Sequence, residues 1–227
     1  MNRLSFLLTI TGGLLAAALP LRAEAAALDL APVQAWVANA AKVKTLIADF
    51  RQERVLRTMK QPLVTTGKLW YSQPANAFRW QTGDPAKLIA ILKPGREELT
   101  VARTEKKEAE VIGKAALQKD RMGQGLSLMQ AGFPSSLEEF QKRFTILAII
   151  PESNWHRVEL KPAVTMGGAV VKVMLMLNAT THKLDAMHVY FRDGSRISSI
   201  FTSMKENAAI PAAQFSMDLT GYTVKRK

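Results

Sequence analysis

The chain has 227 residues, with 31 Lys and Arg against 19 Asp and Glu, a net charge of +12, and no cysteine. The absence of cysteine excludes a disulfide scaffold, a thiol nucleophile, a cysteine zinc site, an iron–sulfur cluster and a lipid anchor on a cysteine of the chain itself. Hydrophobic residues make up 48% of the chain and charged residues 22%, which excludes a wholly disordered protein, and the length fits one domain.

Residues 1–25 have the pattern of a secretory signal peptide. Arg3 gives a positive start, residues 4–19 are almost entirely apolar, and Ala23-Glu24-Ala25 is a small-x-small cleavage site. An uncleaved transmembrane anchor is the alternative interpretation. We expect cleavage after Ala25, a periplasmic location and a mature domain of residues 26–227. Export argues against a nucleic-acid partner, so the positive charge is expected to face membranes or acidic proteins.

The mature chain is predicted to begin with a helix, because Leu30, Val33, Trp36, Val37 and Ala40 recur at helical spacing. From residue 46 the apolar period changes to two, which predicts a strand. Two later helices are predicted over residues 121–131 and 136–142. Similar alternating runs between turn residues predict ten more strands, over residues 63–71, 78–82, 87–92, 98–103, 109–112, 144–150, 155–161, 169–178, 183–191 and 195–204.

About eleven short antiparallel strands, with one helix in front and two in the middle, predict a single α+β domain. A sheet of that length must curl, and helices must cover its apolar face. The chain also has ten methionines, whose flexible side chains suit a surface that adapts to apolar ligands of varied shape, although ordinary core packing is the simpler interpretation.

The sequence contains no catalytic or metal-binding constellation. Of the three histidines, His156, His182 and His188, the last two lie six residues apart with no carboxylate at ligand spacing to either. Exposed strand or turn positions are the simpler interpretation, so no metal site and no cofactor are expected. Ser127 lies in a near match to the nucleophile elbow, but Met129 replaces the closing glycine and no strand precedes it. We interpret Ser127 as an exposed helix residue and the basic tail, residues 225–227, as a solvated end. The chain is therefore not expected to be an enzyme.

A set of short motifs lies in the first half of the mature chain: Phe50-Arg51-Gln52, Gly67-Lys68-Leu69-Trp70-Tyr71, Pro74 and Phe78-Arg79-Trp80. This set resembles the periplasmic outer-membrane lipoprotein carrier family, LolA. In that family a Phe-x-Gln strand precedes Gly-x-Leu-Trp and a Pro…Phe-x-Trp segment.

The resemblance implies an incomplete antiparallel β-barrel whose concave face is covered by a helical lid. It also implies a monomeric, non-enzymatic chaperone whose hydrophobic cavity holds the acyl chains of lipoproteins. In such a family an inner-membrane ABC exporter supplies the lipoproteins and an outer-membrane receptor accepts them.

The resemblance also implies a set of site residues. Phe50 and Leu69 match positions in the cavity wall, and Phe78 and Trp80, two apart, point to the same face. The family's latch arginine, before the proline, is replaced here by Gln73, which we take as the latch candidate. Candidates for the inner face of the lid are Val33, Trp36, Leu126 and Met129.

Other functions remain open at this point. A branch of LolA-like proteins associated with aryl polyene or polyketide-type lipids has a similar pattern, Phe50-Arg51-Gln52-Glu53-Arg54, Pro62-Leu63 and Gly67-Lys68-Leu69 in this chain, and would carry a non-protein lipid. A periplasmic hydrolase of lipid or envelope substrates and a purely structural envelope protein are the alternatives from other classes.

Overall fold

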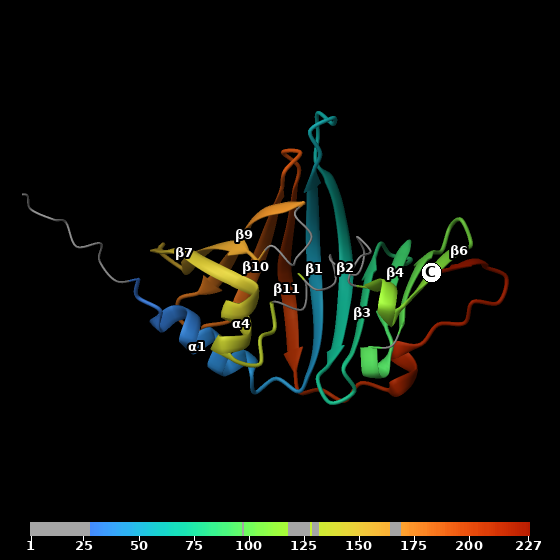
Figure 1. Cartoon of the computed structure of the whole chain (residues 1–227), viewed down its shortest axis with the longest axis horizontal. Coiled ribbons are helices and arrows are strands. Elements are labelled where there is room, and N and C mark those ends of the chain that lie inside the picture. Colours follow the sequence, from blue (N-terminus) through green and yellow to red (C-terminus); the bar gives the residue numbers. More distant parts are fainter. Residues whose placement is uncertain (1–27, 97, 118–127, 129–131, 164–168) are drawn as a thin grey trace, which may run out of the picture.

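One curved sheet of twelve strands forms most of the structure (Figure 1). The computed structural model describes residues 28–96, 98–117, 128, 132–163 and 169–227. The strands lie in the order β12-β6-β5-β4-β3-β2-β1-β11-β10-β9-β8-β7, so β12 and β7 are the two edges and the barrel is open, as expected. The strands are β1 (Thr45–Val55), β2 (Leu63–Ser72), β3 (Ala77–Thr82), β4 (Leu88–Leu92), β5 (Glu98–Arg103), β6 (Glu108–Gly113), β7 (Phe144–Pro151), β8 (Trp155–Pro162), β9 (Val170–Asn178), β10 (Leu184–Phe191), β11 (Arg196–Glu206) and β12 (Thr223–Arg226).

All eleven predicted strands are present and pair antiparallel. The chain end is exposed, as expected, but the prediction missed that it joins the sheet. Residues 223–226 form a twelfth strand, which pairs with β6 in parallel. The strand is short and fully exposed, so no alternation of apolar residues marks it in the sequence. Two cations at this end of the chain have acidic partners: Arg226 lies 3.7 Å from Glu98 of β5, and Lys227, just after β12, lies 2.5 Å from Glu110 of β6.

The inner face of the sheet, defined here as the face that carries Phe50 and Trp80, holds most of the buried apolar side chains. Alternation along each strand places these residues on one side. One cluster covers β1 to β6, and the other covers β8 to β10. Gly67 allows the first cluster to close, because the Phe50 ring occupies the space where a side chain at this position would lie.

Two helices cover the β8–β10 half of the inner face (Figure 1): α1 (Ala31–Ala40) and α4 (Leu137–Arg143). The Asp29 carboxylate accepts a 3.0 Å hydrogen bond from the N–H of Ala31, and the Ser136 hydroxyl accepts a 3.1 Å bond from the N–H of Glu139. Both side chains satisfy N–H groups that have no partner within the helix. Within the described residues, the other short helical elements are η1 (Pro94–Arg96), α2 (Lys114–Leu117) and η3 (Ala212–Phe215).

The C-terminal segment crosses the outer face of the sheet before it reaches β12. Phe215 is buried there against Ile89 and Ile91. Arg79, on the same face, donates to the carbonyl oxygens of Gln214 at 3.2 Å and Ser216 at 3.4 Å. The outer face is therefore closed over β3 and β4 by the chain's own tail, which leaves the inner face as the place to look for a ligand site.

Candidate functional site

A cavity of about 190 Å³ lies on the inner face of the sheet. Its walls come from β3, β4 and β5 on one side and from β10 and β11 on the other, with β1 between them. This volume is several times that of one water molecule, and most of the lining side chains are aliphatic or aromatic. The lining residues are Gln52, Arg54, Phe78, Trp80, Leu88, Ala90, Leu99, Leu128, Met187, Val189, Phe191, Ile197 and Ser199.

The four wall residues expected from the sequence lie together but at two depths. Phe78 and Trp80 line the cavity, with 1% and 8% of their surface exposed. Phe50 stacks on Trp80, with ring centroids 3.7 Å apart and planes 22° from parallel. Leu69 pairs with Trp80 across β2 and β3 and is fully buried. Phe50 and Leu69 therefore support the ring that forms the wall, and neither lines the cavity.

Two of the four residues expected on the inner face of the lid, Val33 and Trp36, lie within the described residues. Val33 and Trp36 are buried in the cluster that joins α1 to α4 and β9, and Trp36 meets Phe140 edge-on at 5.2 Å. Leu126 and Met129 lie outside the described residues, as does Ser127. Leu128, between them, is buried and lines the cavity. The assignment of the lid's inner face therefore stays a prediction.

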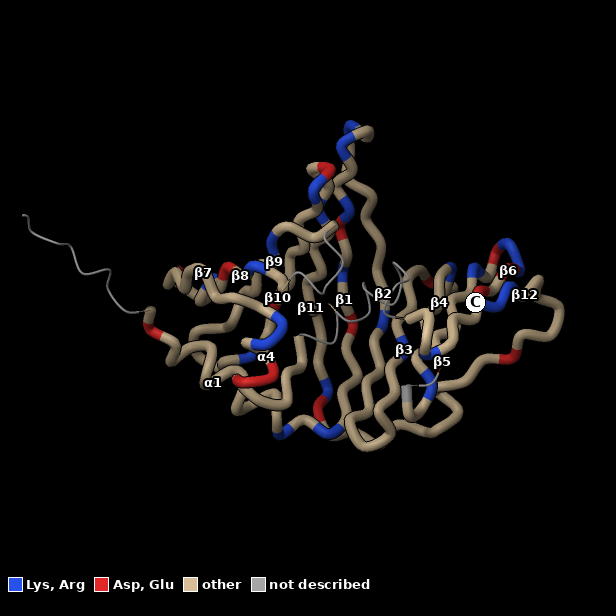
Figure 2. Tube along the Cα trace, in the orientation of Figure 1, with Lys and Arg blue, Asp and Glu red and all other residues tan. Residues whose placement is uncertain are grey.

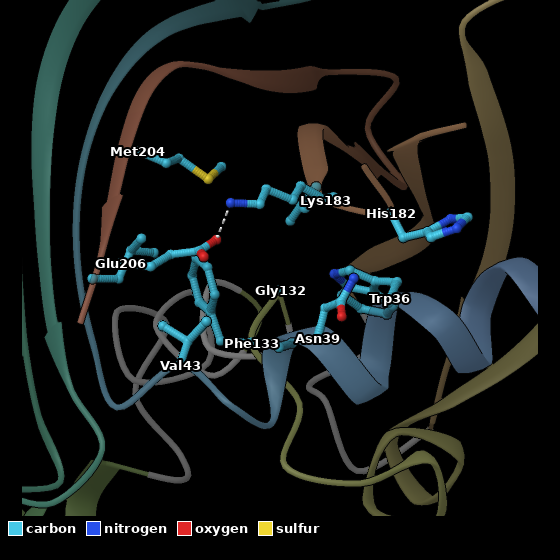
Figure 3. A pocket seen from close by; sticks show the side chains of 12 residues that line it. Trp36, Asn39, Val43, Gly132, Phe133, His182, Lys183, Met204 and Glu206 are labelled. Atoms are coloured by element: carbon cyan, nitrogen blue, oxygen red, sulfur yellow. Dashed lines mark ion pairs between the residues drawn. The ribbon is translucent and has the colours of Figure 1, made fainter. Parts of the chain in front are cut away.

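A second, smaller cavity lies beside the C-terminal end of α1 (Figure 3). Trp36, Phe133 and Met204 line it, and Lys183 and Glu206 form a 2.9 Å ion pair beside it. Its volume of about 30 Å³ matches one water molecule and does not accommodate a lipid chain.

Phe133 packs on the inner face next to this smaller cavity. Its ring stacks on Tyr71 of β2 at 5.8 Å and meets Phe201 of β11 edge-on at 6.4 Å. Gln73 follows β2 in a turn, where its N–H donates to the carbonyl oxygen of Lys44 at 2.8 Å. No hydrogen bond of the Gln73 side chain is found within the described part of the chain, and its role as a latch stays a prediction.

One end of the main cavity is lined by polar side chains from β1 and β11. The Gln52 amide donates to the Ser199 hydroxyl at 3.1 Å, and the next inward residue on β1 is Arg54, which is exposed. An exposed residue that lines a cavity lies at its opening. Gln52 and Arg54 belong to the Phe50–Arg54 pattern noted in the sequence, but they were not predicted as site residues, although the period of two that assigns Phe50 to the inner face also assigns them to it.

The outer face carries the one histidine contact, within the described residues, that resembles catalytic machinery. His188 Nδ1 lies 2.8 Å from the Ser198 hydroxyl. Glu53 pairs with Ser198 across β1 and β11, so the carboxylate lies beyond the serine rather than beyond the histidine. A catalytic triad needs the acid on the histidine, and Ser198 is only 3% exposed. Burial, and then the positive charge of Arg196, lower the pKa of His188.

Two further searches cover only the described part of the chain. Within residues 28–96, 98–117, 128, 132–163 and 169–227, no group of three or more His, Asp or Glu side chains is placed to hold a metal ion. Over the same residues, no helix combines the length and apolar character needed to cross a membrane.

Comparison with known proteins identifies the family. The sequence profile of the outer membrane lipoprotein carrier protein LolA matches residues 41–218, most of the chain. The chain belongs to the LolA family. No curated protein sequence gives a significant match.

Solved structures of similar fold are distant in sequence. An uncharacterized conserved protein from Thermus thermophilus is 8% identical, with a TM-score of 0.51 over 85% of this chain and 95% of that one. An outer membrane lipoprotein-sorting protein domain from Vibrio parahaemolyticus is 12% identical, with a TM-score of 0.47 over 82% and 95% of the two chains. A LolA superfamily protein from Nitrosomonas europaea is 9% identical, with a TM-score of 0.42 over 81% and 97%. At these identities the first comparison supports the fold alone.

Proposed function

We propose that this chain is a periplasmic carrier of acylated lipoproteins. It takes them from an inner-membrane ABC exporter and delivers them to a receptor at the outer membrane, acting as a monomer and without catalysis. The observation that carries this proposal is the apolar cavity of about 190 Å³ on the inner face of an open LolA-family sheet.

Burial of hydrocarbon explains how such a cavity holds its ligand. Each buried methylene of an acyl chain contributes about 0.8 kcal/mol, so a few methylenes between Trp80 and Val189 stabilise a complex without covalent chemistry. Release needs only a receptor that binds the same chain more tightly, because a ligand distributes according to its relative affinities.

The wall is suited to chains of varied shape. Met187, on β10, is a flexible side chain on the side of the cavity opposite the rigid Phe78 and Trp80 rings of β3, and Leu128 adds a further aliphatic side chain to the lining. Among the described lining residues the polar ones, Gln52, Arg54 and Ser199, lie on β1 and β11, and the others are apolar, so this lining selects for hydrocarbon and not for a particular polar structure. This composition supports a carrier of acyl chains over a hydrolase, whose polar catalytic groups would have to face the ligand.

Mass spectrometry of the ligand that copurifies with the mature protein from its native envelope tests the proposal. Triacylated lipoprotein bound in a one-to-one complex is the expected result. A single class of non-protein lipid would refute lipoprotein transport and move the chain to the lipid-carrying branch. A protein that is free of ligand under mild extraction and binds no added acyl chain would refute the carrier function altogether.

A further inference from the structure

The opening of the main cavity carries a positively charged side chain that the carrier function does not require. Along the inward side of β1, Phe50 is buried, Gln52 is half-buried and Arg54 is exposed. Because a strand rises about 3.4 Å per residue, the change from apolar to charged takes place over roughly 14 Å. Trp80 and Arg54 line the same cavity, so a chain that lies against Trp80 can extend its polar end to Arg54.

Arg54 is available to a ligand. Within the described residues it has neither an ion pair nor a hydrogen bond, whereas its neighbour Arg51, on the outer face, pairs with Glu53. An unpaired guanidinium beside an apolar wall has donors free for a carboxylate or phosphate, which it binds in bidentate geometry.

The surroundings of Arg54 are also positively charged. The chain from residue 54 to residue 68 contains no Asp or Glu, and basic residues gather in the β1–β2 hairpin that extends beyond the sheet (Figure 2). Arg57 of this hairpin lies against Gly194 in the turn between β10 and β11. The one carboxylate of that turn, Asp193, already accepts hydrogen bonds from the N–H and hydroxyl of Ser195 at 2.9 and 2.5 Å, which lower its pKa.

We propose that Arg54 binds an anionic headgroup, so that the cavity also takes free acyl chains that end in a carboxylate or phosphate and prefers them to neutral ones. This inference shares the acyl-chain cavity with the proposed function but goes beyond it, because the ester- and amide-linked chains of a lipoprotein carry no such group. It adds a charge requirement that an apolar cavity alone does not impose. An inorganic phosphate ion shares the headgroup chemistry but lacks the chain that fills the cavity.

Binding of cis-parinaric acid, a fluorescent long-chain fatty acid, and of its methyl ester tests the proposal at neutral pH, where the acid is ionised. We expect the wild-type protein to bind the acid about tenfold more tightly than the ester. Arg54→Gln should remove the difference between acid and ester, so that this variant binds both probes equally, and Arg54→Lys should retain part of the preference.

Arg51→Gln is the matched control, because it removes the same charge from the same strand on the opposite face. Equal affinity of the wild-type protein for acid and ester would overturn the headgroup site while leaving the carrier function intact. An equal loss of acid binding in Arg51→Gln would also overturn it, because the preference for the acid would then come from the overall positive charge of the protein and not from Arg54. Complete displacement of bound acid by millimolar inorganic phosphate would overturn the proposal, because it would show that the acyl chain contributes nothing to binding. If neither probe binds, the proposed function fails as well.

Discussion

Replacement of Gly67 by alanine tests whether the Phe50–Trp80 stack sets the shape of the cavity wall. A Cβ atom at this position would lie 2.2 Å from Cζ of Phe50 and 2.3 Å from the carbonyl oxygen of Gln81. Both distances are more than 1 Å shorter than an ordinary contact of 3.4 Å or more. Phe50 has no free space to move into because it stacks on Trp80 and is 1% exposed, and the Gln81 oxygen belongs to the backbone of β3.

We expect Gly67→Ala to destabilise the fold by about 2 kcal/mol or more. Overpacking of a buried site costs about 1–3 kcal/mol or more, and the lower entropy of alanine in the unfolded chain offsets at most about 1 kcal/mol. For a domain of this size the midpoint of thermal unfolding should fall by at least about 4–8 °C. Displacement of Phe50 should also move Trp80, so fatty-acid binding should weaken in the protein that remains folded.

Thermal and urea unfolding followed by tryptophan fluorescence measure this change. Gly113→Ala is the control, because its Cβ would meet the Lys227 carbonyl oxygen at 3.4 Å, an acceptable contact. That variant should stay within about 0.5 kcal/mol of wild type. The reasoning is refuted if the two variants have equal stability.

Two further substitutions probe the cavity and the outer face. Ala90→Leu fills part of the cavity, so it should weaken fatty-acid binding by about tenfold or more and leave stability unchanged or raised by up to about 2 kcal/mol. Ala102→Leu, on the closed outer side of β5, should instead lower stability by about 1–3 kcal/mol, and the opposite pattern in binding and unfolding assays would contradict the assigned faces. The folded-state pKa of His188 lies below its ordinary 6.5, so the unfolded state binds more protons and stability should fall as the pH drops below about 6.5. His188→Asn should reduce this slope in urea unfolding at pH 5 to 7, and an unchanged slope would assign the effect to other groups.

The strands and their faces could be predicted from the sequence because a period of two is a direct consequence of strand geometry. Phe78 and Trp80 were predicted to share a face, and both line the cavity. The depth of each residue could not be predicted in the same way. Phe50 lies behind Trp80 because Gly67 leaves room for its ring, and this depends on the register of β1, β2 and β3.

Contacts between distant parts of the chain were harder to predict. Helical spacing indicates which side of α1 is buried, but it does not say that Trp36 meets Phe140 and covers β9. The strand β12 has no apolar face to reveal it, and it is held by backbone pairing with β6 and by Lys227 beside Glu110. Arg54 belongs to a pattern noted in the sequence, but its place in the lining of the cavity was not predicted, because it depends on the packing of β1 beside β11.

Photo-crosslinking with a long-chain fatty acid that carries a diazirine near the end of its chain tests the central claim most directly. If the inner-face cavity is the acyl-chain site, peptide mapping should find saturable labelling at Trp80, Leu128 and Val189, and Ala90→Leu should reduce it. Labelling confined to the outer-face cluster around Phe215, or labelling that does not saturate, would contradict the account.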